Sequence, residues 1–169
     1  LWAEKRWMSS RAYFLPLTLA LLAALQLGSV LSSYPYYYTY KNPLTNSNGM
    51  RGYGEGLDLA AEYLAQKPDA KNSYVIAYAG RGCFSYFYPG RTEHIKLGTK
   101  DDLPYVEGLH DADYLVLYPL AQKTKPDGAN LMRFLQNVKP EQIITMDGVE
   151  YARIYKIADL PGAIYDTLI

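Results

Sequence analysis

Residues 12–31 read AYFLPLTLALLAALQLGSVL and contain no charged side chain. As a helix, this segment is about 30 Å long, which matches the hydrocarbon core of a bilayer. Its few polar side chains are those of Thr18, Gln26 and Ser29. Within a helix, Ser and Thr hydroxyls can donate hydrogen bonds to backbone carbonyl groups of the preceding turn. The segment therefore predicts a membrane-spanning helix, with the lipid bilayer as a partner of the chain.

The flanks of this segment predict its orientation. Three basic residues precede it (Lys5, Arg6 and Arg11), whereas a tyrosine-rich stretch, YPYYYTY at 34–40, follows it. Cations favour the cytoplasmic side of a membrane, and amphipathic rings favour the level of the headgroups. We expect a plasma (inner) membrane protein whose C-terminal part is extracytoplasmic.

A signal peptide that starts at Met8 is the competing interpretation, since small residues lie near Ser32. The apolar run, however, exceeds the usual ~7–15 residues of a signal core. Leu1 is not an initiator residue, and Trp2 and Trp7 are typical of an interfacial belt. We therefore favour a retained helix in a fragment of a longer protein.

Composition narrows the possible functions. The chain has 17 Lys+Arg and 17 Asp+Glu; without residues 1–33, which hold three basic and one acidic residue, 14 against 16 remain, a net charge of −2. This balance and the lack of a basic stripe argue against nucleic acid as a partner. The single cysteine, Cys83, excludes an intrachain disulfide and a Cys-based zinc site. His94 and His110 lack the spacing of a helical metal pair, so we expect neither a metal nor a cofactor.

The pattern along the chain predicts three parts: a transmembrane helix with its cytoplasmic flank (1–33), a connector rich in Tyr, Pro and Asn (34–53), and an extracytoplasmic α/β domain (54–169). Turn signals in the connector lie at 42–43 and 48–49. The domain is expected to begin with a helix over 55–66 that buries Leu57, Ala60, Ala61 and Leu64. We then expect strands over 73–79 and 92–98, a short helix over 101–107 and a strand over 113–117. A helix capped by Asp127 follows, and the last predicted element is a hairpin of 142–146 and 149–157 around Asp147-Gly148.

Alternation of helices and strands favours an α/β fold. We expect a small Rossmann-like, mainly parallel sheet with a C-terminal antiparallel hairpin at one edge.

Several motifs suggest chemistry but have simpler explanations. Gly52-x-Gly54-x-Gly56 lacks the spacing and the preceding strand of a dinucleotide site, so we interpret it as the flexible start of a helix whose first turn holds Glu55 and Asp58. Asp111 and Asp113 are expected to be solvated, and His110 has no nucleophile nearby. Cys83 is expected to be a small buried residue. We predict no catalytic residues in this chain.

Gly80-Arg81-Gly82 is the best candidate for binding, because ligands of open α/β sheets gather where strands end. Arg81 and Arg91 bracket an aromatic segment that contains Tyr86, a combination suited to a lipid phosphate, a sugar face or a headgroup. Arg81, Tyr86 and Arg91 are therefore the predicted binding residues. The alternative is a surface loop whose tyrosines pack on the domain or rest against the membrane.

An ordered set of motifs carries a family resemblance over about residues 12–158. After the spanning helix, these are YPYYY (34–38) with YKNPL (40–44), GYGEGL (52–57), YFYPGR (86–91), ADYLVLY (112–118) and GVEYARIY (148–155). The set resembles bacterial membrane glycosyltransferases of family 39, which are similar to dolichyl-phosphate-mannose–protein mannosyltransferases and have the GT-C fold.

The resemblance implies an enzyme with many spanning helices that moves a sugar from a polyprenyl-phosphate donor to an acceptor outside the cytoplasm. The family's acidic base lies in an early extracytoplasmic loop, which would precede Leu1, so no catalytic residue carries over to this chain. The chain would be the last transmembrane helix and the C-terminal domain, an accessory part that contacts the preceding transmembrane bundle and a lipid-linked donor or acceptor. A membrane-anchored or secreted binding module without a catalytic role is the alternative.

Overall fold

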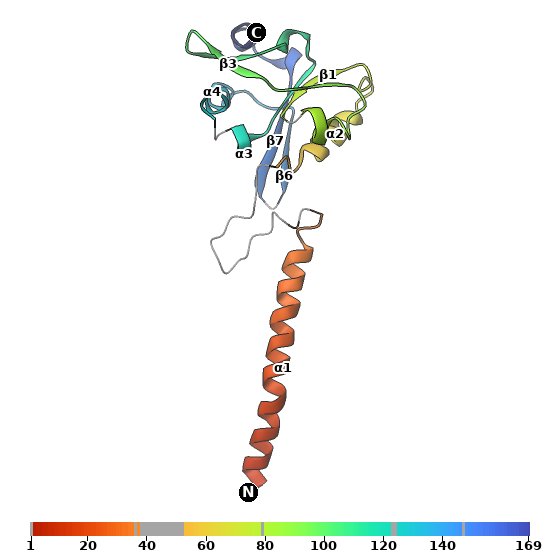
Figure 1. Ribbon diagram of the computed structural model, residues 1–169, viewed down its shortest axis with the longest axis vertical. Coiled ribbons are helices and arrows are strands. Elements are labelled where there is room, and N and C mark those ends of the chain that lie inside the picture. Colours follow the sequence, from red (N-terminus) through yellow and green to blue (C-terminus); the bar gives the residue numbers. More distant parts are fainter. Residues whose placement is uncertain (1, 36, 38–52, 79, 123–124, 147) are drawn as a thin grey trace. The chain divides into compact units, whose positions relative to one another are not determined.

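The computed structural model describes residues 2–35, 37, 53–78, 80–122, 125–146 and 148–169 (Figure 1). The chain divides into two compact units, Leu1–Met50 and Arg51–Ile169. Most of the predicted connector, including its two turn signals, lies outside the described residues.

Helix α1 dominates the first unit. It runs over Trp2–Leu31, 30 residues in all, so the predicted segment 12–31 forms its C-terminal part. The window Tyr13–Leu31 has a mean hydropathy of 2.0 and is 0% buried. As expected, the Thr18 hydroxyl donates to the Phe14 carbonyl at 2.8 Å, which hides its polarity within the helix. Helix α1 is thus long and apolar enough to cross a bilayer, a property that a signal sequence shares.

The second unit is built on a five-stranded sheet in the order β2-β1-β5-β7-β6. Its strands are β1 (Tyr74–Ala77), β2 (Arg91–His94), β5 (Tyr114–Leu117), β6 (Gln142–Met146) and β7 (Val149–Lys156). Strands β2, β1 and β5 are parallel to one another, whereas β7 is antiparallel to both β5 and β6. The predicted α/β class is confirmed: the sheet is mixed, and the C-terminal hairpin forms one edge.

The two central parallel strands are buried throughout. Every residue of β1 and β5 is buried, as expected for strands that are covered on both faces. Alternate side chains enter opposite cores, so Val75 and Val116 face one side of the sheet and Ile76 and Leu115 face the other.

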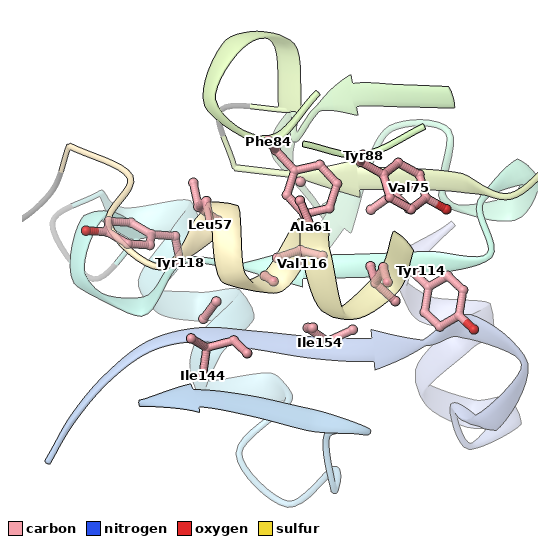
Figure 2. Packing of buried hydrophobic residues seen from close by; sticks show 14 of the residues in the cluster. Leu57, Ala61, Val75, Phe84, Tyr88, Tyr114, Val116, Tyr118, Ile144 and Ile154 are labelled. Atoms are coloured by element: carbon pink, nitrogen blue, oxygen red, sulfur yellow. The ribbon is translucent and has the colours of Figure 1, made fainter. Parts of the chain in front are cut away.

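Helix α2 (Leu57–Ala65) covers the first face. Its residues Leu57, Ala60, Ala61 and Leu64 are all 0% exposed, which confirms the helical face predicted from their spacing. Figure 2 shows α2 over the sheet, with Phe84 and Tyr88 on one side of the helix and Ile144 and Ile154 on the other.

The second face is covered by later parts of the chain. They are α4 (Pro126–Phe134), α5 (Gly162–Leu168) and a two-stranded antiparallel sheet of β3 (Leu97–Lys100) and β4 (Leu103–Val106). Leu131 from α4, Val106 from β4 and Leu168 from α5 are all fully buried in this core. Short elements complete the unit: η2 (Gly80–Phe84), η3 (Leu109–Asp111), α3 (Pro119–Gln122) and η4 (Ile157–Asp159).

The helix predicted over 101–107 is wrong. Asp101 and Asp102 have φ angles of 50° and 63°, and these left-handed residues turn β3 back on itself as β4. The strand predicted over 92–98 is correspondingly two strands, β2 in the main sheet and β3 in the small one. A strand partner, which local periodicity does not reveal, decides the structure at this point.

The predicted cap of α4 is also wrong by two positions. Lys125 occupies the N-cap, Pro126 starts the helix and Asp127 lies in the first turn. Proline suits this first position because its missing N–H has no partner to lose there, and a carboxylate in the first turn is favoured by the helix dipole. The predicted C-terminal hairpin is confirmed, with Gly148 at a φ of 70° in its turn and Asp147 outside the described residues.

Candidate functional site

Two of the three predicted binding residues line one cavity. Arg81 lies in η2, directly after β1, and Arg91 starts β2, the strand beside β1. Both border a polar cavity of about 290 Å³, together with Tyr74, His94, Lys96 and carboxylates from three segments. The chain thus brings together two arginines that are ten positions apart in the sequence.

Carboxylates balance the charge of this cavity. One terminal nitrogen of Arg81, Nη2, donates to both carboxylate oxygens of Glu93, at 2.7 and 3.0 Å. Lys96 forms an ion pair with Glu107 at 2.8 Å. Hydrogen bonding by Arg81 holds the pKa of Glu93 below its usual value. With Arg91 and Asp111 the lining has three cations and three carboxylates, whose charges balance.

Arg91 is held differently from Arg81. Its guanidinium carbon lies 4.0 Å from the centre of the Tyr74 ring, in a cation–π contact. This contact fixes the side chain at the cavity wall and leaves its planar donors available. Arg91 is therefore the better-placed cation for an incoming anion.

Tyr86, the third predicted residue, does not line this cavity. Its side chain is 84% exposed and packs edge to face on Phe87, with ring centres 4.9 Å apart. Tyr86 therefore lies outside the cavity that the two arginines line, although the sequence suggested a single binding patch.

A second cavity, of about 220 Å³, lies where parallel strands end. Tyr78 directly follows β1, His94 ends β2, and the start of α4 contributes Lys125 and Asp127. Asp127 accepts a hydrogen bond from Thr99 of β3 at 2.8 Å. His94 borders this cavity as well as the first, so the two are neighbours.

A row of three aromatic side chains, Tyr78, His94 and Tyr118, lies at the ends of the three parallel strands. Tyr78 is tilted against His94, with ring centres 5.8 Å apart, and stacks on Tyr118, with ring centres 5.2 Å apart and an angle of 17° between the rings. Rings beside polar groups suit small ligands that have both an apolar face and hydroxyl groups, such as sugars. Sequence reasoning missed this row; the rule that ligands gather at carboxyl ends of strands was the signal that could have found it.

Tyr118, the last of these three aromatic residues, contacts a buried carboxylate. Glu55 is only 2% exposed, and it accepts hydrogen bonds from the Tyr118 hydroxyl and, at 3.2 Å, from the Tyr53 backbone N–H. The sequence placed Glu55 in the first turn of a helix; in the structure it precedes the N-cap, Gly56, and only Asp58 lies in that turn. Glu55 therefore ties the segment before α2 to the end of β5.

The remaining candidates are structural or solvent-exposed. Asp111 and Asp113 are both exposed, as expected. Asp113 accepts the Tyr74 backbone N–H at 2.7 Å and thereby links β5 to β1, and Asp111 lies 3.3 Å from His110. The expectation that Cys83 is buried is wrong, since it is exposed in η2. Its thiol lies beside Gly54 rather than in a core.

Within the described part of the chain, no group of three or more His, Cys, Asp or Glu side chains is placed to hold a metal ion. What the two cavities offer is hydrogen bonding, charge and ring faces, which are the means of binding a ligand. Comparison with protein-family models, curated proteins and solved structures found no match.

Proposed function

We propose that this chain is the membrane-anchored accessory domain of a glycosyltransferase that takes its sugar from a polyprenyl-phosphate donor. In this proposal α1 is the anchor and the α/β unit binds the lipid-linked donor or the acceptor. The preceding transmembrane bundle of the same polypeptide supplies the reaction centre, and the α/β unit lies on the extracytoplasmic side of the plasma membrane. The family resemblance and the basic flank of α1 support it.

One observation carries the proposal: Arg81 and Arg91 line the same cavity beside the end of a parallel strand. A guanidinium group binds two phosphate oxygens at once, which makes arginine well suited to a phosphate linkage. The cavity is neutral, but the Arg81 side chain is 75% exposed and its pair with Glu93 is a surface contact of little strength. The phosphodiester of the donor, which presents two oxygens to a guanidinium group, can therefore replace Glu93 as the partner of Arg81.

The test uses the complete gene product in proteoliposomes with a polyprenyl-phosphate sugar as the donor. Arg81→Ala and Arg91→Ala should each raise KM for the donor, and the double variant should raise it by about tenfold or more, because two charge-assisted contacts are lost. Arg133→Ala, which removes an exposed arginine from α4, is the matched control and should leave KM unchanged. Unchanged KM and kcat in the double variant would exclude this role for the cavity.

A reciprocal variant sharpens the test. Glu93→Gln frees Arg81 and leaves the cavity with one more cation than carboxylate, so KM for the donor should fall several-fold. This effect should shrink as salt is added, because the gain is electrostatic. A simple loss of structure would raise KM in both sets of variants.

The alternative, a membrane-anchored or secreted binding module, uses the same cavities without a transferase. The reading frame upstream of the codon for Leu1 separates the two. Several spanning segments and an early acidic loop favour the transferase, whereas initiation at Met8 favours the module.

A further inference from the structure

Two neighbouring aromatic side chains are exposed on the α/β unit and have no part in the proposed function. Tyr86 is 84% exposed and Phe87 is 41% exposed, in the turn 85–87 that follows η2. We call Tyr86 and Phe87 the ring pair. Its edge-to-face contact makes one continuous aromatic surface, with ring centres 4.9 Å apart.

The ring pair is held outward by its neighbours. Phe84, just before the turn, is 0% exposed, and Tyr88, just after it, is 4% exposed; the two pack against each other with ring centres 5.5 Å apart. Burial raises the pKa of Tyr88 to about 12, so this anchor stays neutral. Within the turn, the Tyr86 N–H donates to the Gly82 carbonyl at 3.1 Å. Because both ends of the turn are held in the core, Tyr86 stays exposed and Phe87 stays partly exposed.

The start of the α/β unit lies beside this turn. A Cβ on Gly54 would lie 3.6 Å from the thiol of Cys83, so the segment that contains Gly54 and the exposed Tyr53 lies against η2. From Tyr53 back to Tyr37, after the end of α1, there are 16 residues, which reach at most about 55 Å. The domain is therefore confined near whatever surface holds α1.

The chemistry of the rings indicates which environment they favour. Tyrosine and other amphipathic rings favour the headgroup layer of a bilayer, where the apolar part of the ring leaves water and the hydroxyl keeps its hydrogen bonds. Arg81, in η2, adds an exposed guanidinium close to the turn. An exposed ring pair on a membrane-tethered domain thus has a lipid surface within reach.

We propose that the ring pair docks the α/β unit onto the headgroup layer of the bilayer that holds α1. The inference rests on the membrane anchor of the proposed function and is independent of transferase activity. Docking fixes one face of the unit toward the lipid, so that the cavity with Arg81 and Arg91 is presented close to the headgroups rather than free in solution.

The single cysteine provides a native probe. Cys83 is exposed and lies three positions before Tyr86, so a fluorophore on its thiol reports the depth of the turn. The full chain is placed in nanodiscs of phosphatidylcholine and phosphatidylglycerol (3:1) that contain a lipid-attached quencher. The matched control carries the same label in Cys83→Ser/Asn72→Cys, because Asn72 is exposed just before β1 starts, at the opposite end of that strand from η2.

We expect lipid-attached quenching at Cys83 to exceed that at position 72 by at least threefold. Tyr86→Ser and Tyr86→Ser/Phe87→Ser, which change only exposed side chains, should reduce it in steps toward the control while circular dichroism stays unchanged. Equal quenching at both sites, or quenching that survives removal of the rings, overturns the inference. So does protection from both lipid-attached and aqueous quenchers, which would indicate a protein partner such as a second copy of the chain. Failure of the chain to enter nanodiscs overturns the anchor as well, whereas loss of sugar transfer alone affects only the proposed function.

Discussion

Tyr118 and Glu55 show how one buried pair fixes the start of the domain. Tyr118 is 0% exposed and its hydroxyl donates to Glu55, 63 positions earlier in the chain. Tyr118→Phe removes the donor but leaves the carboxylate buried, so it should lower the free energy of unfolding by about 1–3 kcal/mol. Tyr86→Phe, the same change on an exposed ring, should alter it by less than about 0.5 kcal/mol. Urea unfolding in detergent micelles, followed by near-UV circular dichroism, compares the two; equal effects would contradict a structural role for the pair.

A second residue pair gives a pH dependence. Glu141 contacts Lys67 at 2.6 Å and accepts the Tyr63 hydroxyl at 2.9 Å. Burial alone would raise the pKa of Glu141, but the hydrogen bonds from Lys67 and Tyr63 hold it below the ordinary 4.5. A lowered pKa in the folded state means that this stabilisation is present above pH 4.5 and is lost as the pH falls through the folded-state pKa.

Glu141→Gln should therefore cost about 0.5–1 kcal/mol at pH 7, and the difference from the parent chain should shrink toward pH 3. Unfolding measured at several pH values tests this. Glu62→Gln, an exposed acid on α2, is the control and should show no such convergence. A constant difference across the pH range would mean that the cost is one of packing rather than of charge.

Sequence patterns predict those features of the structure that depend on residues close together in the sequence. The spacing of Leu57, Ala60, Ala61 and Leu64 is enough to define the buried face of α2, because any amphipathic helix must bury that face. The burial of Glu55 could not be predicted in this way, since it depends on Tyr118 at the end of a distant strand. Arg81 and Arg91 are candidates from their place after a strand, but the carboxylates that balance them come from segments that meet only in the fold.

At the scale of elements, η2 must lie very close to β2. A Cβ on Gly80 would be 2.1 Å from the Glu93 carbonyl oxygen, a separation that backbone atoms cannot tolerate. Gly80→Ala should push η2 away from β2 and lower the free energy of unfolding by about 1–3 kcal/mol. It should also loosen the contact between Arg81 and Glu93. Gly162→Ala is the control, because nothing lies within 4 Å of its added methyl group. Equal melting temperatures for the two variants would contradict this packing.

Elements that depend on a partner strand are the ones that sequence patterns misassign. The strand within 113–117 is predicted correctly because a run of apolar, strand-forming residues is buried on both faces wherever it lies. The segment Leu103–Val106 was predicted to be helical but forms a strand. That strand exists only because it pairs with Leu97–Lys100 across the Asp101-Asp102 turn. Two consecutive left-handed aspartates are uncommon, which is why the turn is not expected from the sequence.

At the scale of the whole molecule, the two units need different surroundings. The hydrophobic cores of the α/β unit are built from residues between Leu57 and Leu168. The window Tyr13–Leu31, in contrast, is 0% buried. Water is an unfavourable solvent for such a surface, so α1 needs lipid, detergent or a protein cover, while the α/β unit has a core of its own.

This difference predicts membrane retention that depends on α1. Membranes from cells that express the chain should keep it in the pellet after an alkaline carbonate wash. Leu21→Arg/Leu25→Arg places two cations in the middle of the apolar window, at about 2.5–3.5 kcal/mol each, and should release most of the chain. Leu21→Phe/Leu25→Phe keeps the window apolar and should leave the chain in the pellet. The mass of the chain in the pellet and in the wash then separates the two interpretations of α1. Cleavage near Ser32, with the α/β unit in the wash, would mean that the helix is a signal sequence, whereas an intact chain in the pellet means that the helix itself holds the domain at the membrane.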